Sequence, residues 1–333
     1  MSRLSFFIKR LMRIDRKRFK ETFAAIKKRS GKSTPWLLVD MLICSLRYGA
    51  GYMDYSIAEM YRLNHKQKST TITRGISNDI VRRMNDKSYT HFFDDKAEFN
   101  THFSKWINRK WLHFDETTTR ESFKDFIKGC TSIFVKPIEG SSGVGVNRVD
   151  ELSDADSLYD SIKALGDSII EETVVQHSEM ARLCPNSVNT VRIATLIGDK
   201  KSGIVYTFLR IGNGKAVDNV DCGGMACRID TDTGIIITPA ANKAGEVFYN
   251  HPITGSKFIG FKIPHFDKAK QICLEAMNIV PEVRFVAWDV AITKDGACFI
   301  EGNSFPSHAV PQFAAHYPDG MGILTEFRKF LDC

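Results

Sequence analysis

The sequence lacks the cysteine patterns that mark zinc sites and disulfide frameworks. Only 8 of its 333 residues are cysteines, and they form no CxxC pair and no array with histidines at zinc-ligand spacing. It also lacks a segment long enough to span a bilayer, because the apolar stretch 35–46 is short and contains Asp40. The apolar run at 4–8 is followed at once by charges, unlike a secretory signal. These absences predict reduced thiols and a cytoplasmic location.

Acidic residues are scarce in the first 32 residues, which hold twelve Lys/Arg but only Asp15 and Glu21. In the remainder, acids slightly outnumber bases, so the formal net charge of +7 comes from the N-terminus. A basic segment with interleaved apolar residues is typical of an amphipathic helix. Residues 1–32 therefore either pack on the body of the protein or lie on the inner face of an anionic membrane. Nucleic acid binding is not expected, and the sequence does not determine the oligomeric state.

Motifs of the common nucleophilic and nucleotide-binding enzymes are absent. There is no G-x-S-x-G, and no cysteine stands in a recognisable catalytic motif. The stretch FVKPIEGSSGVGV, residues 134–146, has its lysine before the glycines, whereas a Walker A loop ends in Gly-Lys-Ser/Thr. It also lacks the third glycine of a Rossmann fingerprint. Strand-like residues flank it, so we expect a hairpin whose tip folds over phosphates, with Lys136 supplying a positive charge. The alternative is a plain glycine-rich turn beside an exposed lysine.

The periodicity of apolar residues changes along the chain. It is helical up to about residue 85, and a mixed segment follows to about residue 130. From residue 131, short runs rich in Val, Ile, Thr and Phe, bounded by turn residues, indicate strands. The expected strands are 131–137, 168–176, 188–197, 203–212, 224–230, 234–239, 283–293 and 297–303, with helices near 152–165, 177–183 and 266–279. This order predicts an α+β fold with mostly antiparallel sheet.

Oxygen-bearing side chains gather in a second stretch, AWDVAITKDGACFIEGNSFPSH. Asp295-Gly296 is a hairpin turn signal midway between Asp289 and Glu301. The two acids should therefore lie nearly opposite each other on adjacent strands. Asn303 is two residues beyond Glu301 and shares its face. Two carboxylates and an amide oxygen are ligands that Mg²⁺ accepts when it bridges nucleotide phosphates. The alternative is a polar-faced surface hairpin.

Taken together, the lysine strand, the small-residue loop and the Asp…Glu-x-Asn hairpin resemble the ATP-grasp superfamily. The ending EGNSFPSH is similar to the E-x-N-[ST]-x-P end of D-alanine–D-alanine ligases. The closest resemblance is to the sugar-transfer associated ATP-grasp family of capsule and exopolysaccharide gene clusters, over about residues 50–315. The segments that carry it are DYSIAEMYRLN, FVKPIEGSSGVGV, EETVVQH, NSVNTVRIATLI, LRIGNGKAVDNVDCGGMACRID, HPITG and WDVAIT…FIEGN. The resemblance implies an ATP-grasp fold, in which two α+β subdomains clamp ATP.

The resemblance also implies roles on the phosphate side of the clamp. Lys136 would contact the ATP phosphates, and Ser141, Ser142 and Gly143 would close over them. Arg192 would reach the γ-phosphate and the developing acyl phosphate. One or two Mg²⁺, with Mn²⁺ as an alternative, would be held by Asp289, Glu301 and Asn303.

The adenine side of the clamp would be the strand IIEETVV. The residues expected to meet the adenine and ribose are Glu171, Glu172, Thr173 and Val174. Superfamily members also use an earlier lysine, for which Lys87 is preferred over Lys96. On the acceptor side, the candidates are Arg210, Asp218, Asn219, Ser304 and His308. For the polar residues around the glycines of LRIGNGKAVDNVDCGG, the alternative to an acceptor site is a hairpin turn that carries polar side chains.

The expected units are a basic helical region at 1–85, a small lid subdomain at 86–176 and a large subdomain at 177–333 with the metal and acceptor site. The helical region departs from the family, since ATP-grasp enzymes usually have an α/β domain in that place. Because that α/β domain commonly helps to bind the acceptor, this departure leaves the identity of the acceptor substrate undetermined.

The activity that the resemblance implies is an ATP- and Mg²⁺-dependent ligase. It would activate a carboxylate as an acyl phosphate and join it to an amine, in surface polysaccharide biosynthesis such as that of capsule or O-antigen. Its partners would be a small-molecule acid and an amino or sugar acceptor. Two alternatives stay open: an ATP-dependent phosphotransferase acting on a sugar or polymer, and a non-catalytic nucleotide-binding scaffold.

Overall fold

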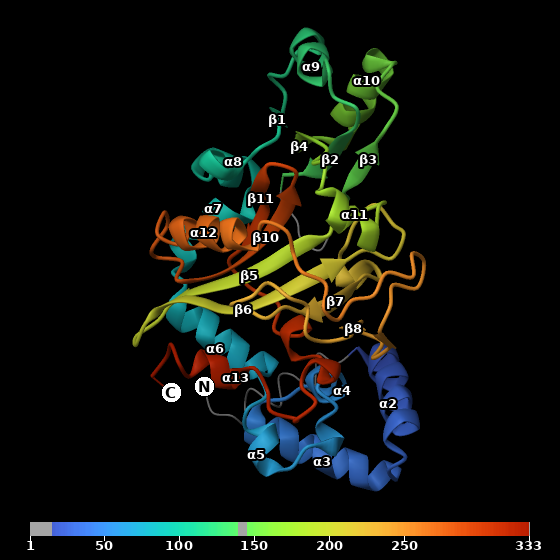
Figure 1. Ribbon diagram of the computed structural model, residues 1–333, viewed down its shortest axis with the longest axis vertical. Coiled ribbons are helices and arrows are strands. Elements are labelled where there is room, and N and C mark those ends of the chain that lie inside the picture. Colours follow the sequence, from blue (N-terminus) through green and yellow to red (C-terminus); the bar gives the residue numbers. More distant parts are fainter. Residues whose placement is uncertain (1–14, 139–144, 333) are drawn as a thin grey trace.

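An antiparallel sheet lies at the centre of the computed structural model, which describes residues 15–138 and 145–332 (Figure 1). Within these residues the sheet has seven strands in the order β11-β10-β5-β6-β7-β8-β9. The strands are β5 (Thr190–Ile197), β6 (Ser202–Ile211), β7 (Met225–Arg228), β8 (Ala240–Ala241), β9 (Val247–Phe248), β10 (Phe285–Thr293) and β11 (Gly296–Asn303). All its neighbouring strands pair antiparallel, which confirms the predicted sheet type.

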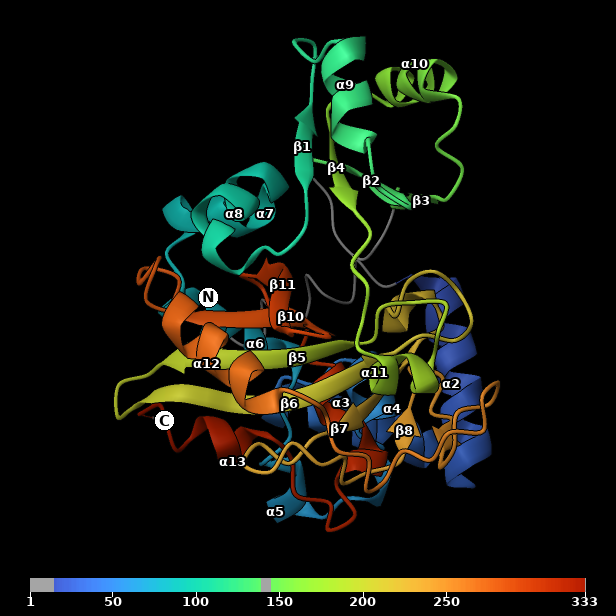
Figure 2. The ribbon, with the colours of Figure 1, turned by 45° about the horizontal axis from the view of Figure 1, so that its top comes forward.

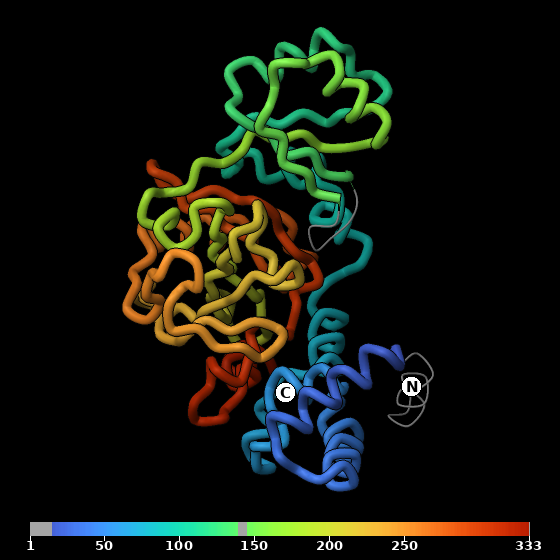
Figure 3. Tube along the Cα trace, turned by 90° about the vertical axis from the view of Figure 1, so that its right-hand side faces the viewer, coloured from blue at the N-terminus to red at the C-terminus, as the bar shows by residue number. Residues whose placement is uncertain are grey.

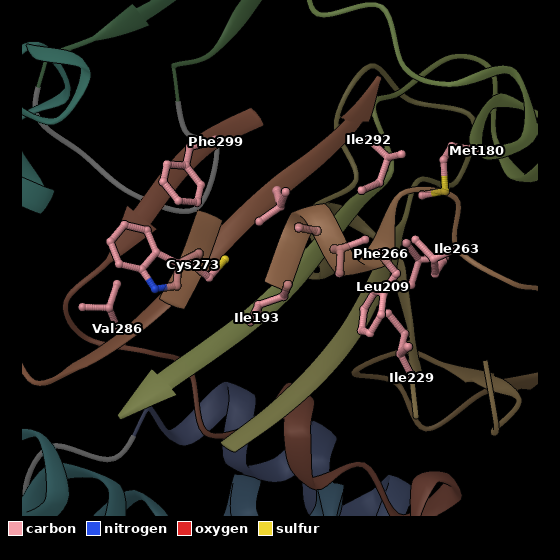
Figure 4. Close-up of a cluster of buried hydrophobic side chains, with 14 of the residues drawn as sticks. Met180, Ile193, Leu209, Ile229, Ile263, Phe266, Cys273, Val286, Ile292 and Phe299 are labelled. Carbon is pink, nitrogen blue, oxygen red and sulfur yellow. The ribbon is translucent and has the colours of Figure 1, made fainter. Parts of the chain in front are cut away.

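Alternating side chains of the central strands build a core on each face of this larger sheet. On one face, Ile193 and Leu209 pack against Phe266 and Cys273 of the overlying helix, as Figure 4 shows. On the other face, Phe208 packs with residues of two further helices. The covering helices are α12 (Phe266–Ala276) on the first face and α6 (Arg74–Met84) and α13 (Leu324–Phe327) on the second. Because each fully buried large side chain contributes about 1.5–3 kcal/mol, both layers hold the sheet firmly.

A smaller sheet stands at one end of the molecule (Figure 2). Its described part has four antiparallel strands in the order β1-β4-β2-β3. The strands are β1 (Trp111–Phe114), β2 (Ile133–Pro137), β3 (Asn147–Val149) and β4 (Ser168–Glu172), and the helices beside them are α9 (Arg120–Ile127) and α10 (Ala155–Leu165). Phe114, Phe123 and Tyr159 pack between the sheet and these helices. Strands β2 and β3 form the hairpin predicted around the glycine-rich stretch.

Two short helices join the sheets, α7 (His91–Asp94) and α8 (Lys96–His102). They pack on the larger sheet, where the rings of Phe93, Phe99 and Phe103 contact Trp288. The predicted unit 86–176 therefore contains residues that pack on both sheets. Its boundaries stay a prediction.

The chain before α6 is helical, as predicted for the residues described. Its helices are α2 (Arg16–Ser30), α3 (Thr34–Tyr48), α4 (Tyr52–Ile57) and α5 (His65–Lys68). They lie at the end of the molecule opposite the smaller sheet (Figure 3). Buried Asp54 attaches them to the body, because it accepts from His308 Nε2 at 2.7 Å and from the backbone N–H of Arg74 at 3.2 Å.

One predicted strand is wrong. At 234–239 the structure has only isolated bridges, at Ile235 and Ile236. The backbone N–H of Ile236 donates to Phe261, whereas that of Ile237 donates to Arg228. Consecutive residues therefore pair with different segments, and no ladder forms in spite of the β-type composition. The remaining short elements are α11 (Ser178–Leu183), η1 (Met60–Arg62), η2 (Lys87–Tyr89), η3 (Ser104–Trp106), η4 (Val220–Cys222), η5 (Val310–Gln312) and η6 (Ala314–His316).

Asn85 ties the end of α6 to β10 and to the residue that follows β11, so its removal should be costly. Its buried Nδ2 donates to the carbonyls of Phe285 and Ser304 at 2.8 and 2.6 Å, and its Oδ1 accepts from Phe285 N at 2.8 Å. Since Asn85→Ala leaves these buried groups unpaired, we expect the free energy of unfolding to fall by about 2–4 kcal/mol. Urea unfolding measures it. The exposed Asn278→Ala is the control, with an expected change within about 0.5 kcal/mol; equal midpoints for the two variants would contradict the role of Asn85.

Candidate functional site

A cavity lies between the two sheets, where β2 and β4 face β10 and β11. The smaller sheet and the segment after it contribute Phe134, Lys136, Pro137, Val146, Glu171, Glu172 and Val174. The larger sheet contributes Thr190, Arg210, Asp289, Ile300 and Glu301. The rest of the lining is Lys96, Arg109, Val188, Ala216, Val217, Asp218 and Asn219. The cavity therefore unites the lysine strand and the acidic hairpin, which are far apart in the chain.

Strand register places three charged residues in one row on the larger sheet. Asp289 on β10 pairs with Glu301 on β11 and with Arg192 on β5. Directly opposite residues have Cβ atoms only about 4.5–5.5 Å apart. The two acids thus face each other across the hairpin, as the turn position predicts.

Two arginines engage the Asp289 carboxylate. Arg192 donates through Nε and Nη2 to its two oxygens at 2.7 and 2.6 Å. Arg210 donates through Nη1 to Asp289 and through Nη2 to Asp218 at 2.8 Å. Asp218 also accepts from the backbone N–H of Thr190 at 2.9 Å. Burial alone would raise the pKa of Asp289, but the charges of Arg192 and Arg210 outweigh it and hold this pKa below its ordinary range.

Glu301 has a different environment, although it adjoins Asp289. Its side chain is exposed to the cavity. The surrounding protein atoms, followed by the Asp289 charge, raise the pKa of Glu301. Asn303 Nδ2 lies 3.4 Å from Glu301 Oε1 and donates to the carbonyl of Ala287 at 3.3 Å. One carboxylate of the pair is thus anchored by arginines, while the other faces the cavity.

The oxygens of this row suit a hard divalent cation. Asp289 and Glu301 offer carboxylate oxygens on one side of the cavity, whereas Asn303, whose Nδ2 lies beside Glu301, is not a lining residue. Among the residues described, no cluster of three or more His, Cys, Asp or Glu has metal-ligand geometry, so a bound ion would depend on further oxygens. Asp289 would also have to share an oxygen that Arg210 contacts. The residues fit a cation that arrives with phosphate oxygens of its own.

Buried Glu171 is the centre of a second charged cluster, on the smaller sheet. It accepts from Lys136 Nζ, from Arg109 Nη2 and from Asn100 Nδ2, the last at 2.9 Å. Burial alone would raise the pKa of Glu171, but the charges of Arg109 and Lys136 outweigh it and lower this pKa. Glu171 thereby fixes Lys136, whose side chain is mostly buried at the cavity wall.

Arg109 links this cluster to the larger sheet. Its Nη1 donates to the carbonyl of Phe299 at 2.6 Å and its Nη2 to that of Ile300 at 3.2 Å. Consecutive carbonyls of a regular strand point in opposite directions. At this place, however, the register of β10 and β11 shifts, since Asp289 pairs with Glu301 and the next residue with Phe299. The resulting bulge at Ile300 lets both carbonyls accept from one guanidinium.

The sequence profile described as "Sugar-transfer associated ATP-grasp" matches residues 76–318, which is well over half of the chain. The chain belongs to that ATP-grasp family. The match contains both sheets and the cavity-lining residues, and it begins within α6, near the end of the predicted helical region 1–85. No curated protein matches this chain significantly.

Three solved structures are similar to this chain at low identity. The D-alanine–D-alanine ligase from Helicobacter pylori has a TM-score of 0.46 and 12% identity, over 74% of this chain and 63% of that one. The D-cycloserine synthetase DcsG has a TM-score of 0.46 and 10% identity, over 76% of each chain. The ligase PsnB, solved with a minimal precursor, Mg and ADP, has a TM-score of 0.39 and 13% identity. The match to PsnB covers 67% of this chain and 54% of that one, so this chain spans about half the length of PsnB.

Two lysines of this ATP-grasp chain reach the cavity, Lys136 and Lys96. Lys96 Nζ donates to the carbonyl of Ile138 at 3.1 Å, and burial, with Lys136 nearby, lowers its pKa. Lys87, which the sequence favours as the upstream lysine, is exposed on η2 and is not a lining residue. Of the two candidates, Lys96 is therefore the one at the cavity, because the α7–α8 turn brings it back there, and the lysine that contacts ATP stays a prediction.

The residues expected to meet the adenine and ribose do not all reach the cavity. Glu172 and Val174 line the cavity, but the backbone N–H of Thr173 donates to Ser132 at 3.1 Å and Thr173 is not a lining residue. Glu171 also lines the cavity, and its carboxylate accepts from Arg109 and Lys136. The expected phosphate-closing residues Ser141, Ser142 and Gly143 lie outside the residues described.

Of the residues expected to contact phosphate or acceptor, the fold places some at the cavity and others away from it. Arg192 is not a lining residue, because its guanidinium lies behind Asp289. Arg210 lines the cavity instead, together with Asp218 and Asn219. Two acceptor candidates lie away from the cavity: Ser304 is buried and donates to Asp94 at 3.2 Å, and His308 contacts Asp54 of the N-terminal helices. They fasten the chain after β11 and do not reach the cavity.

Sequence reasoning missed Arg109 and Asn100. Both side chains bond Glu171, and Arg109 also bonds the larger sheet. Neither residue stands in a motif. The one local signal is that Arg109 stands two residues before strand β1, which is too common to single it out.

The Glu171 cluster should make stability fall at acid pH. Its folded pKa lies below the ordinary glutamate value of about 4.3, so its contribution is complete above that pH and is lost as the pH falls toward the folded pKa. Glu171→Gln leaves Arg109 and Lys136 without their charge partner, and should cost about 3 kcal/mol near neutral pH. We expect this deficit to shrink between about pH 5 and pH 3.

Urea midpoints measured across that pH range test the expectation. The exposed Glu116→Gln is the matched control and should follow the unaltered chain throughout. A deficit of Glu171→Gln that stays the same at every pH would contradict the charged role of Glu171.

Proposed function

We propose that this chain is an ATP- and Mg²⁺-dependent ligase that activates a carboxylate as an acyl phosphate and joins it to an amine. One observation carries the proposal. The cavity of this ATP-grasp chain sets Lys96 and Lys136 on one side against Asp289, Glu301 and Arg210 on the other. A triphosphate with its cation requires both positive and negative side chains within one site.

The lining divides by chemistry into two regions. An apolar region suits a flat base, and its residues are Phe134, Pro137, Val146, Val174, Val188, Ala216, Val217 and Ile300. The charged region suits phosphates, with Lys96 and Lys136 donating to oxygens. Mg²⁺, or Mn²⁺, would be held by Asp289, Glu301 and Asn303, and it would neutralise phosphate charge.

Transfer of the γ-phosphate would proceed by positioning and electrostatic stabilisation. A carboxylate oxygen of the donor acid attacks the γ-phosphorus, the bond to ADP breaks, and an acyl phosphate forms. The amine nitrogen then attacks the acyl carbon, inorganic phosphate leaves, and the amine gives up a proton. Arg210 faces the cavity with its guanidinium between Asp218 and Asp289, where it can donate to the transferred phosphoryl oxygens. Arg192 keeps Asp289 in place during these steps.

The family description and the acceptor-side residues support a sugar-linked substrate. We propose a small-molecule acid as donor and an amino sugar or related amine as acceptor, within surface polysaccharide synthesis such as that of capsule. The loop that carries Asp218 and Asn219 closes one side of the cavity, so it is our candidate for contact with the acceptor.

Glu301→Ala tests the metal assignment without disturbing the two arginines. Glu301 is exposed to the cavity, and Arg192 and Arg210 bond Asp289, so the variant should stay folded. We expect its ATP turnover to fall by about 10²–10³-fold with acid and amine pairs, because phosphate charge is less well neutralised. Release of ADP and phosphate measures it, with the exposed Glu282→Ala as control.

Three outcomes of that assay count against parts of the proposal. Turnover that survives in both Glu301→Ala and Asp289→Ala would sink the metal assignment. A phosphate ester that persists in place of free phosphate would show a phosphotransferase. ATP binding without turnover across many acceptors would show a nucleotide-binding scaffold.

Lys96 and Lys87 form a second, matched pair of variants. Because Lys96 lines the cavity and Lys87 does not, Lys96→Met should raise the KM for ATP by about tenfold or more. Lys87→Met should leave it within about twofold. Steady-state kinetics with ATP as the varied substrate decides between them, and the reverse pattern would restore the assignment of Lys87.

A further inference from the structure

Helix α3 presents a broad apolar face that the described part of the chain leaves open. We call it the α3 apolar face, and it consists of Trp36, Leu38, Val39, Leu42, Ile43 and Leu46. Each of these side chains is between 41% and 58% exposed. At 100° per residue they span about 160° of the helix, without a charged residue among them. An exposed contiguous apolar patch of this kind marks an interaction site.

The opposite side of α3 explains why this face is open. Leu37 and Cys44 are fully buried against the other N-terminal helices. Asp40, which interrupts the apolar stretch in the sequence, also points inward, where it accepts from Lys68 Nζ and Tyr55 OH at 2.7 Å each. The helix already has a complete buried side, so its outer side is not needed for the core.

Basic residues stand at both ends of the α3 apolar face. Lys32, before the helix, has its Nζ 5.2 Å from the centroid of the Trp36 ring. Arg47 is exposed at the other end of the helix. Exposed lysines and arginines also cover α2, whose basic residues are Arg16, Lys17, Arg18, Lys20, Lys27 and Lys28. An apolar face with cationic residues at its edge is complementary to a surface that has an anionic outer layer over an apolar interior.

We propose that the α3 apolar face docks on an anionic lipid bilayer and lies in the plane of its headgroups. None of the described helices is long and apolar enough to cross a membrane. An in-plane helix needs no such length, because only its apolar side enters the acyl boundary. A second copy of the chain fits the surface less well, since pairing two such faces would also bring their cationic borders together. The inference stands apart from the ligase proposal.

This placement changes the role predicted for residues 1–32 and fits the position of the cavity. Residues 1–32 still supply basic charges, whereas the apolar contact comes from α3, which follows them in the chain. The N-terminal helices lie at the far end of the molecule from the smaller sheet (Figures 1 and 3). Docking through α3 therefore leaves the cavity between the sheets open to solvent.

Flotation of the full chain with vesicles tests the proposal. The vesicles contain phosphatidylcholine alone or phosphatidylcholine with phosphatidylglycerol. The variant carries Leu38→Gln, Leu42→Gln and Leu46→Gln, since Gln preserves helix propensity. The control carries the same change at three exposed apolar positions elsewhere, Leu165→Gln, Leu274→Gln and Ile279→Gln. Thermal unfolding and light scattering verify the fold and the oligomeric state of each chain.

We expect the unaltered chain and the control to float with anionic vesicles, and high salt to weaken the binding. The α3 variant should have a partition coefficient lower by about tenfold or more, because three large apolar contacts are lost. Flotation of the α3 variant equal to that of the control would overturn the proposal. So would failure of the unaltered chain to bind, or a dimer that only the α3 variant dissociates.

Discussion

The buried contact between Arg109 and Glu171 is the constraint on which the arrangement of the two sheets depends. Glu171 belongs to the smaller sheet, while Arg109 also bonds the carbonyls of Phe299 and Ile300 on the larger one. One guanidinium thus joins both walls of the cavity. Removing one partner of such a buried pair typically costs about 3–5 kcal/mol, because the other charge is left uncompensated. Lys136 is held by the same glutamate, so the position of the cationic wall follows from this contact.

Charge pairing on the larger sheet follows the same physics but leaves one group unbalanced. Asp289 and Asp218 are neutralised by Arg192 and Arg210, whereas Glu301 faces the cavity beside them. Two adjacent carboxylates are thereby given opposite pKa shifts. The two arginines stabilise the acidic side of the cavity without a ligand. Arg210 can donate either to Asp289 or to an anion that enters the cavity. Preorganised charge of this kind costs little reorganisation when a charged substrate binds.

The N-terminal helices α2 to α5 lie outside the part of the chain that matches the family. The family match begins after them, and none of their described residues line the cavity. They are attached through buried polar contacts at Asp54, which His308 reaches from the chain after β11. The same C-terminal motif that resembles a ligase ending thus holds the helices to the body. The attached helices then present an apolar, cationic surface far from the chemistry.

By itself the sequence determined the α+β class, the antiparallel β10–β11 hairpin and the pairing of Asp289 with Glu301, because turn signals and alternation act over a few residues. It also determined the family, because several weak motifs occur in the right order. The tertiary structure alone decided which lysine reaches the cavity, why Arg192 lies behind Asp289, and how Arg109 joins the sheets. These choices depend on which distant side chains compete for one buried charge. Such competition has no periodicity along the chain, so only the packed fold could reveal it.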